Sequence, residues 1–167
     1  SPEEIITRDF VVRERPDVLL NVVDGTNLER NLYLTTQLME LGANMLVSLN
    51  MYDEVLQQGT RIDIKQFQKL LGCHVVPTSA VKKEGLSELL DHIVRIHEKK
   101  IIISKNKLGY DPLEKDQTLL AENRYGFIRG VIAETVSYID KPVKTITDWI
   151  DMFLINRVLG IPIFLFI

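Results

Sequence analysis

The stretch that decides the fold is MLVSLNMYD, residues 45–53. Its first five residues are apolar apart from Ser48, as is typical of a strand that is buried on both faces of a parallel sheet. Asn50 and Asp53 follow directly, three positions apart. Ligands of open parallel sheets bind beyond the carboxyl ends of the strands. These two polar side chains therefore stand where a ligand would be expected.

Strand and helix patterns alternate around this stretch. We predict strands at 17–24, 45–49 and 75–76, and helices at 2–14, 26–41, 63–71 and after Gly85. Capping boxes at Thr26-x-x-Glu29 and Asp63-x-x-Gln66 open two of the helices, and Gly42 and Gly72 end them. Apolar strands alternating with amphipathic helices indicate an α/β fold whose parallel sheet is covered on both faces.

After Lys100 the pattern changes, and no further strand is expected. A polar segment at 104–118 leads to predicted helices at 121–138 and 145–158. We divide the chain into an α/β domain at 1–103, a helical subdomain at 104–158 and an apolar run at 159–167. A bilayer crossing takes about 20 residues, so we expect this last run to be only the start of a membrane segment. Both ends suggest an excerpt of a longer protein.

Composition excludes several kinds of partner. The net charge is −3 and no Lys/Arg run exceeds two residues, so we expect no nucleic-acid binding. The single cysteine, Cys73, is interpreted as a small buried hydrophobe. His74, His92 and His97 form no metal-ligand spacing with Cys73 or with one another. We therefore predict no metal site.

The Asp53 carboxylate suggests recognition of a guanine ring. It can accept hydrogen bonds from guanine N1–H and the N2 amine, whereas adenine would leave the buried carboxylate unpaired. Asn-x-x-Asp alone also fits a loop that caps the next helix. The second motif, Pro77-Thr78-Ser79-Ala80, follows the next strand and falls on the same sheet edge. Asp24 and Asn27 also lie there, but we favour helix capping for them over nucleotide contacts.

Four segments carry a family resemblance. They are NVVDGTNLERNLYL (21–34), LNMYDE (49–54), VPTSAVKKEGL (76–86) and NRVLGIPIF (156–164). In this order, and over essentially the whole chain, they resemble FeoB-type ferrous iron transporters. The resemblance implies a partial Ras-like P-loop GTPase sheet, then a small all-helical subdomain, then a polytopic membrane domain that moves Fe²⁺. It places this segment on the cytoplasmic side of the cell (inner) membrane.

The resemblance also implies a ligand, GTP or GDP, and roles for single residues. Asp53 would read guanine N1 and N2, Asn50 would tie the loop together, and the Ser79-Ala80 backbone would offer an N–H to guanine O6. The implied guanine-binding set is Asn50, Met51, Asp53, Thr78, Ser79 and Ala80.

The phosphate half of such a site is not found in this sequence. None of its 9 glycines begins a G-x-x-x-x-G-K-[ST] loop. Mg²⁺ is therefore expected only in the complete domain, and we expect this chain alone not to hydrolyse GTP at a useful rate. The implied partners are an N-terminal half of the G domain and the membrane transport domain, and a homo-oligomer stays open. The alternative is a non-catalytic α/β-helical interaction module of a split or degenerate transporter.

Met51 generates a first prediction. G proteins in general carry Lys at this position, and FeoB-type sequences commonly carry Met. A thioether can cover the ring face but makes no alkyl-ammonium contact, so we expect modest affinity and quick nucleotide release. Met51→Lys should slow the dissociation of fluorescent GDP from the completed domain. Unchanged dissociation would count against this role.

Overall fold

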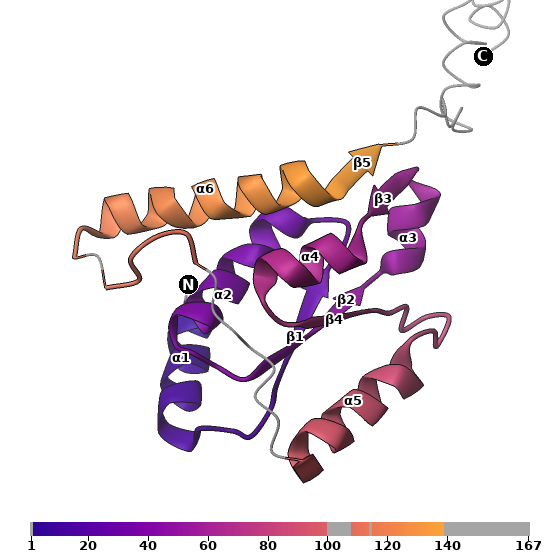
Figure 1. The fold of residues 1–167 in the computed structure, drawn as a ribbon, viewed down its shortest axis with the longest axis horizontal. Helices are drawn as coiled ribbons and strands as arrows, with labels where there is room; N and C mark the ends of the chain where they lie inside the picture. The colour runs from indigo at the N-terminus through magenta and orange to yellow at the C-terminus, as the bar shows by residue number, and fades with distance from the viewer. Residues whose placement is uncertain (1, 100–107, 114, 139–167) are drawn as a thin grey trace, which may run out of the picture.

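The computed structural model describes residues 2–99, 108–113 and 115–138 (Figure 1). The predicted helix at 145–158 and the apolar run at 159–167 lie outside this part. Within it, no helix is long and apolar enough to cross a membrane. The elements are α1 (Pro2–Glu14), β1 (Leu19–Asp24), α2 (Leu28–Glu40), β2 (Met45–Asn50), α3 (Tyr52–Gln57), β3 (Thr60–Ile62), α4 (Ile64–Leu71), β4 (His74–Pro77), α5 (Leu86–Lys99), α6 (Gln117–Thr135) and β5 (Val136–Tyr138).

The central sheet is parallel, with strand order β1-β2-β4, which confirms the predicted α/β architecture. Its register pairs Asp24 with Asn50 and Leu49 with Pro77. All three strands therefore end at the same edge. The loops that follow β1, β2 and β4 are brought together there, as the sequence pattern predicted.

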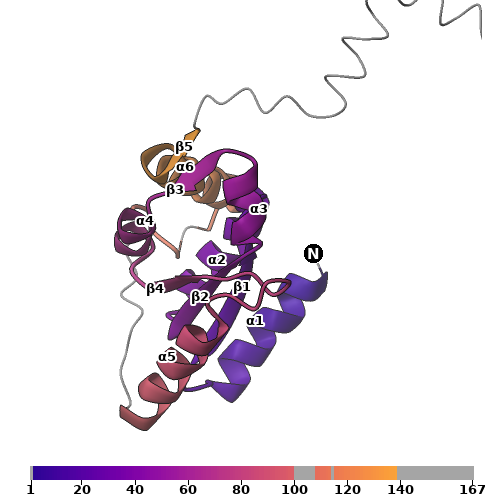
Figure 2. The same cartoon turned by 90° about the vertical axis from the view of Figure 1, so that its right-hand side faces the viewer.

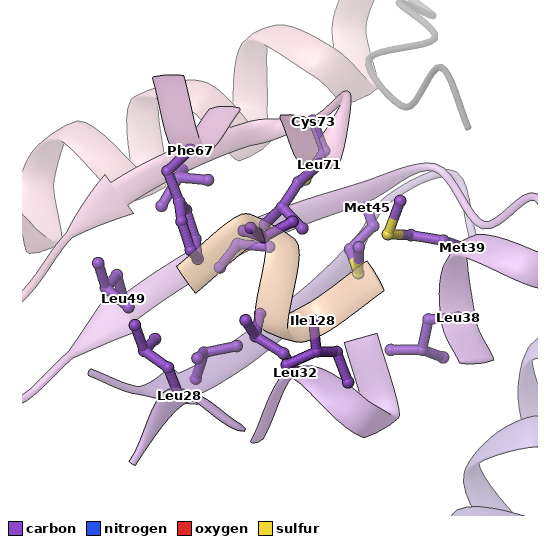
Figure 3. Packing of buried hydrophobic residues seen from close by; sticks show 14 of the residues in the cluster. Leu28, Leu32, Leu38, Met39, Met45, Leu49, Phe67, Leu71, Cys73 and Ile128 are labelled. Carbon is purple, nitrogen blue, oxygen red and sulfur yellow. The ribbon is translucent and has the colours of Figure 1, made fainter. Parts of the chain in front are cut away.

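Helices cover both faces of this sheet. The larger core joins α2, α4 and α6 to one face; the close view in Figure 3 shows Ile128 of α6 within this cluster, together with Leu32 and Phe67. A smaller cluster packs Leu89 of α5 against Leu46 and Val76 on the other face. In Figures 1 and 2, α5 and α6 accordingly lie on opposite sides of the sheet.

Helix α6 docks onto α2 through a charged pair as well as through the core. Arg124 donates to both carboxylate oxygens of Glu40, at 2.8 and 2.6 Å, and also to the Tyr33 hydroxyl at 3.2 Å. Tyr110 donates to the same carboxylate at 2.8 Å. Bidentate Arg–carboxylate pairs are among the stronger polar contacts because their geometry is fixed. The division of the chain at residue 103 stays a prediction.

Two helix-end predictions had different outcomes. Asp63 caps α4 by accepting from the Gln66 N–H at 3.0 Å, as its capping box predicted. The box predicted at Thr26 is wrong, because α2 begins after Asn27, which makes no side-chain cap hydrogen bond. Thr26 turns back instead: its N–H and hydroxyl both donate to Asp24 Oδ1, at 2.8 and 2.7 Å. Asp24 therefore stabilises the turn before α2.

The predicted helix at 121–138 needs a second correction. It runs from Gln117 to Thr135, and residues 136–138 form strand β5. This strand pairs antiparallel with β3, a strand that sequence reasoning did not find either. Periodicity could not reveal two three-residue strands. Their stability comes from pairing with each other across about 75 residues of chain, a tertiary effect that overrides local propensity.

Gly85, at the turn between the β4 loop and α5, allows a direct test of this fold. Its φ is +73°, and a Cβ there would lie 2.1 Å from the Pro77 carbonyl oxygen. We expect Gly85→Ala to lower the free energy of unfolding by at least about 1–2 kcal/mol, as measured by urea denaturation.

Gly130→Ala is the matched control. Gly130 lies inside α6 with open space around it, so this change should raise stability by about 0.5–1 kcal/mol. Equal effects of the two substitutions would contradict the geometry described for Gly85.

Candidate functional site

The loop after β2 places Asp53 in the first turn of a helix. Met51 adopts a left-handed conformation, with φ of 59°, and α3 begins at the next residue. The Met51 carbonyl then accepts from the N–H groups of Glu54 and Val55, at 3.0 and 3.1 Å. The left-handed Met51 therefore leads directly from β2 into α3, and this residue is 36% exposed.

Asn50 joins this loop to the loop after β4. Its Oδ1 accepts from the Ala80 N–H at 3.3 Å and lies 3.5 Å from the Thr78 hydroxyl. Backbone hydrogen bonds run in parallel with this link: Tyr52 N–H donates to the Thr78 carbonyl at 3.1 Å, and Gly25 N–H donates to the Asn50 carbonyl at 2.9 Å. The loops after all three central strands are thus tied to one another.

Two buried hydroxyl groups lie next to the contacts that Asn50 makes with Thr78 and Ala80, which we call the joint between the two loops. Ser48 Oγ and Thr78 Oγ1 are 2.7 Å apart, and both residues are almost fully buried. Sequence reasoning did not single out Ser48. The available signal was its polarity within an otherwise apolar strand, since a buried hydroxyl needs a partner.

The second loop is closed on itself between Ser79 and Glu84. Each residue donates its backbone N–H to the carbonyl of the other, at 3.1 Å in both cases. The Ser79 Oγ also accepts from the Lys82 N–H at 3.2 Å. The Ser79 N–H is thus bonded to Glu84. Of the two neighbours Ser79 and Ala80, only Ala80 therefore donates its backbone N–H to Asn50.

Asp53 is held ionised by this second loop. A hydrogen bond from the Ser79 side chain is the largest cause that lowers the pKa of the Asp53 carboxyl below its ordinary value of 3.8. Burial acts in the opposite direction, while backbone hydrogen bonds at Asp53 and the charge of Lys82 lower the pKa further. Lys82 Nζ lies 3.7 Å from Asp53 Oδ2, and the Asp53 side chain is only 12% exposed. At neutral pH the site therefore presents a carboxylate that acts as an acceptor only.

Other candidate residues lie away from this edge. Cys73 is buried, which raises the pKa of its thiol to about 12, in keeping with its interpretation as a small hydrophobe. The rings of His74 and His92 stack with centroids 5.3 Å apart, a contact that sequence spacing could not reveal. In the described residues, no three His, Cys, Asp or Glu side chains gather in a way that could hold a metal ion.

A sequence comparison gives the first link to known proteins. The family model described as "Ferrous iron transport protein B" matches residues 1–93. The Fe(2+) transporter FeoB of Campylobacter jejuni is 38% identical over 168 residues, which cover 100% of this chain and 27% of that protein. The chain thus spans about a quarter of the length of this relative.

Solved structures agree on the fold. The FeoB G-domain from Methanococcus jannaschii matches with a TM-score of 0.56 and 50% identity, over 59% of this chain and 63% of that one. The cytosolic domain of the T. maritima FeoB iron transporter in a GDP form matches with a TM-score of 0.72 and 23% identity. That match covers 82% of this chain and 74% of that one. At that identity the second likeness concerns the fold alone.

The hydrogen bond between the Ser48 and Thr78 hydroxyls should contribute to the stability of the fold. Thr78→Val keeps the side-chain volume but leaves the Ser48 hydroxyl buried without a partner, so it should cost about 1–3 kcal/mol of unfolding free energy. The double variant Ser48→Ala/Thr78→Val removes both hydroxyls and should recover part of that loss. Urea denaturation of the unsubstituted chain, Ser48→Ala, Thr78→Val and the double variant measures both effects. Strictly additive losses would show that the two hydroxyls do not interact.

Proposed function

Because this chain belongs to the ferrous iron transport protein B family, we propose that it is the base-reading part of the GTP-binding regulatory region of a ferrous iron membrane transporter. In this proposal it works on the cytoplasmic side of the cell membrane, while Fe²⁺ passes through a separate membrane part. The observation that carries the proposal is the ionised Asp53 carboxylate beside the joint made by Asn50, Thr78 and Ala80.

Guanine recognition would use groups from both loops. The two oxygens of Asp53 would accept from guanine N1–H and from the N2 amine. The Ala80 N–H would donate to guanine O6, and its present hydrogen bond to Asn50 is long enough, at 3.3 Å, to be shared or exchanged. The Met51 thioether would cover one face of the ring.

The same arrangement would disfavour adenine. Adenine presents an acceptor at N1, facing the Asp53 carboxylate, and an amine at C6, facing the Ala80 N–H. Acceptor would thus meet acceptor, and donor would meet donor. A buried polar group left without its partner costs about 1–3 kcal/mol. Discrimination would therefore come from rejecting the wrong base as much as from binding the right one.

Phosphate binding would belong to another part of the G domain. The 167 residues contain no G-x-x-x-x-G-K-[ST] loop. Within the described residues no three His, Cys, Asp or Glu side chains gather in a way that could hold a metal ion, and we assign no metal-dependent step to this chain. In the proposal, hydrolysis of GTP is a property of the completed domain.

The phosphate-binding part of the G domain would join the sheet at its edge strand β1. Leu20 and Val22 alternate along β1 on the face that α5 covers elsewhere, and they are 40% and 58% exposed. Among the described strands β1 pairs only with β2, so the backbone groups along its other edge can pair with a further strand. We propose that the phosphate-binding half of the G domain adds here.

Base selectivity provides the test. The 167-residue chain should bind guanosine in preference to adenosine in ligand-observed NMR titrations, and Asp53→Ala should abolish the preference. Asp91→Ala, which removes an exposed carboxylate on α5, should leave it intact. If the preference survives in Asp53→Ala, another group reads the base and the proposal is wrong.

A further inference from the structure

Lys82 makes a contact that the proposed function leaves unexplained. Its ammonium lies 3.7 Å from Asp53 Oδ2, the carboxylate that would read the base. The Lys82 side chain is 46% exposed, while that of Asp53 is 12% exposed. A carboxylate meant for a ligand is thus largely covered before any ligand has arrived, and Lys82 is part of what covers it.

Ser79 and Lys82 act on Asp53 as one unit. The Ser79 side chain makes a hydrogen bond with the carboxylate, and its Oγ accepts from the Lys82 backbone N–H at 3.2 Å. The mutual backbone hydrogen bonds of Ser79 and Glu84 close this loop at its base. The Lys82 side chain can therefore leave the carboxylate by rotating its own torsions while the backbone stays in place.

We propose that Lys82 is an internal competitor of guanine for Asp53. This inference rests on the proposed function, because it concerns the same carboxylate. Guanine N1–H and N2–H need both oxygens of Asp53, and the ammonium already faces one of them. Binding therefore exchanges an ion pair for two hydrogen bonds from a neutral base, and the gain from those bonds is reduced by the ion pair that is lost.

The size of the effect follows from the exposure of Lys82, whose side chain is 46% exposed although Asp53 is mostly covered. Ion pairs at exposed positions contribute little and are screened by salt. Removing the ammonium should therefore tighten guanosine binding about two- to fivefold. Adenosine cannot donate to Asp53 from its N1, so its binding should not change. A lysine that merely positioned the carboxylate would have the opposite effect, since its loss would weaken guanosine binding.

The experiment titrates the 167-residue chain and its variants with guanosine and adenosine, followed by ligand-observed NMR. Lys82→Ala should bind guanosine more tightly than the unsubstituted chain. Lys82→Arg keeps the charge, and its guanidinium can pair with both carboxylate oxygens, so it should bind guanosine no more tightly than the unsubstituted chain does. Lys83→Ala, which removes the neighbouring exposed lysine, is the matched control and should also leave the affinity unchanged.

Salt dependence separates competition from a structural role. Guanosine is neutral, so salt acts on its binding mainly through the protein's own ion pair. Affinity of the unsubstituted chain should rise with added NaCl toward that of Lys82→Ala, whose affinity should stay constant. Weaker or unchanged guanosine binding by Lys82→Ala would overturn the inference while leaving base selectivity intact. If no protein in the series prefers guanosine to adenosine, the proposed function fails and the role of Lys82 fails with it.

Discussion

The arrangement of the site depends on the hydrogen bonds that the side-chain oxygen of Asn50 accepts. This oxygen lies between the Ala80 N–H and the Thr78 hydroxyl and so links the loop after β2 to the loop after β4. The backbone carbonyl of the same residue accepts from Gly25, in the loop after β1. One residue therefore connects the ends of three parallel strands, and the relative positions of Asp53 and Ser79 follow from it.

Much of this arrangement could be predicted from the sequence, because its causes are local. Apolar runs separated by helical periods predict a parallel sheet, and a parallel sheet brings its carboxyl ends to one edge. Asp63 caps its helix through a hydrogen bond from Gln66, and Gly42 ends another helix through a hydrogen bond to Met39. Both bonds span only three residues of the chain. Asn50 and Thr78 came together because the register of β2 and β4 requires it.

The features that were missed depend on distant parts of the chain. Strands β3 and β5 are stable only because they pair with each other, so neither carries a signal of its own. The Lys82–Asp53 pair spans 29 positions and joins two loops whose conformations periodicity does not describe. Thr26 was predicted to cap α2, yet the carboxylate of Asp24, two residues earlier, offered its groups a nearer partner.

The hydrophobic core supports the loops of the site, which lie at the edge of a sheet of only three strands. Helices α2, α4 and α6 bury one face of the three strands, and the Arg124–Glu40 pair fixes α6 on α2. Helix α2 begins just after the Asp24 turn, so this packing also supports the loop that contacts Asn50. A recognition group must be held in place before the ligand arrives if little affinity is to be lost on binding.

Inosine offers the most direct measurement of the central claim, because it differs from guanosine only in lacking the N2 amine. If Asp53 accepts from both N1–H and N2–H, and Ala80 donates to O6, two results are expected in ¹⁵N-resolved titrations of this chain. Both nucleosides should shift the Ala80 amide signal, but inosine should bind several-fold more weakly. Equal affinities, or an Ala80 amide signal that does not respond to either nucleoside, would contradict the account.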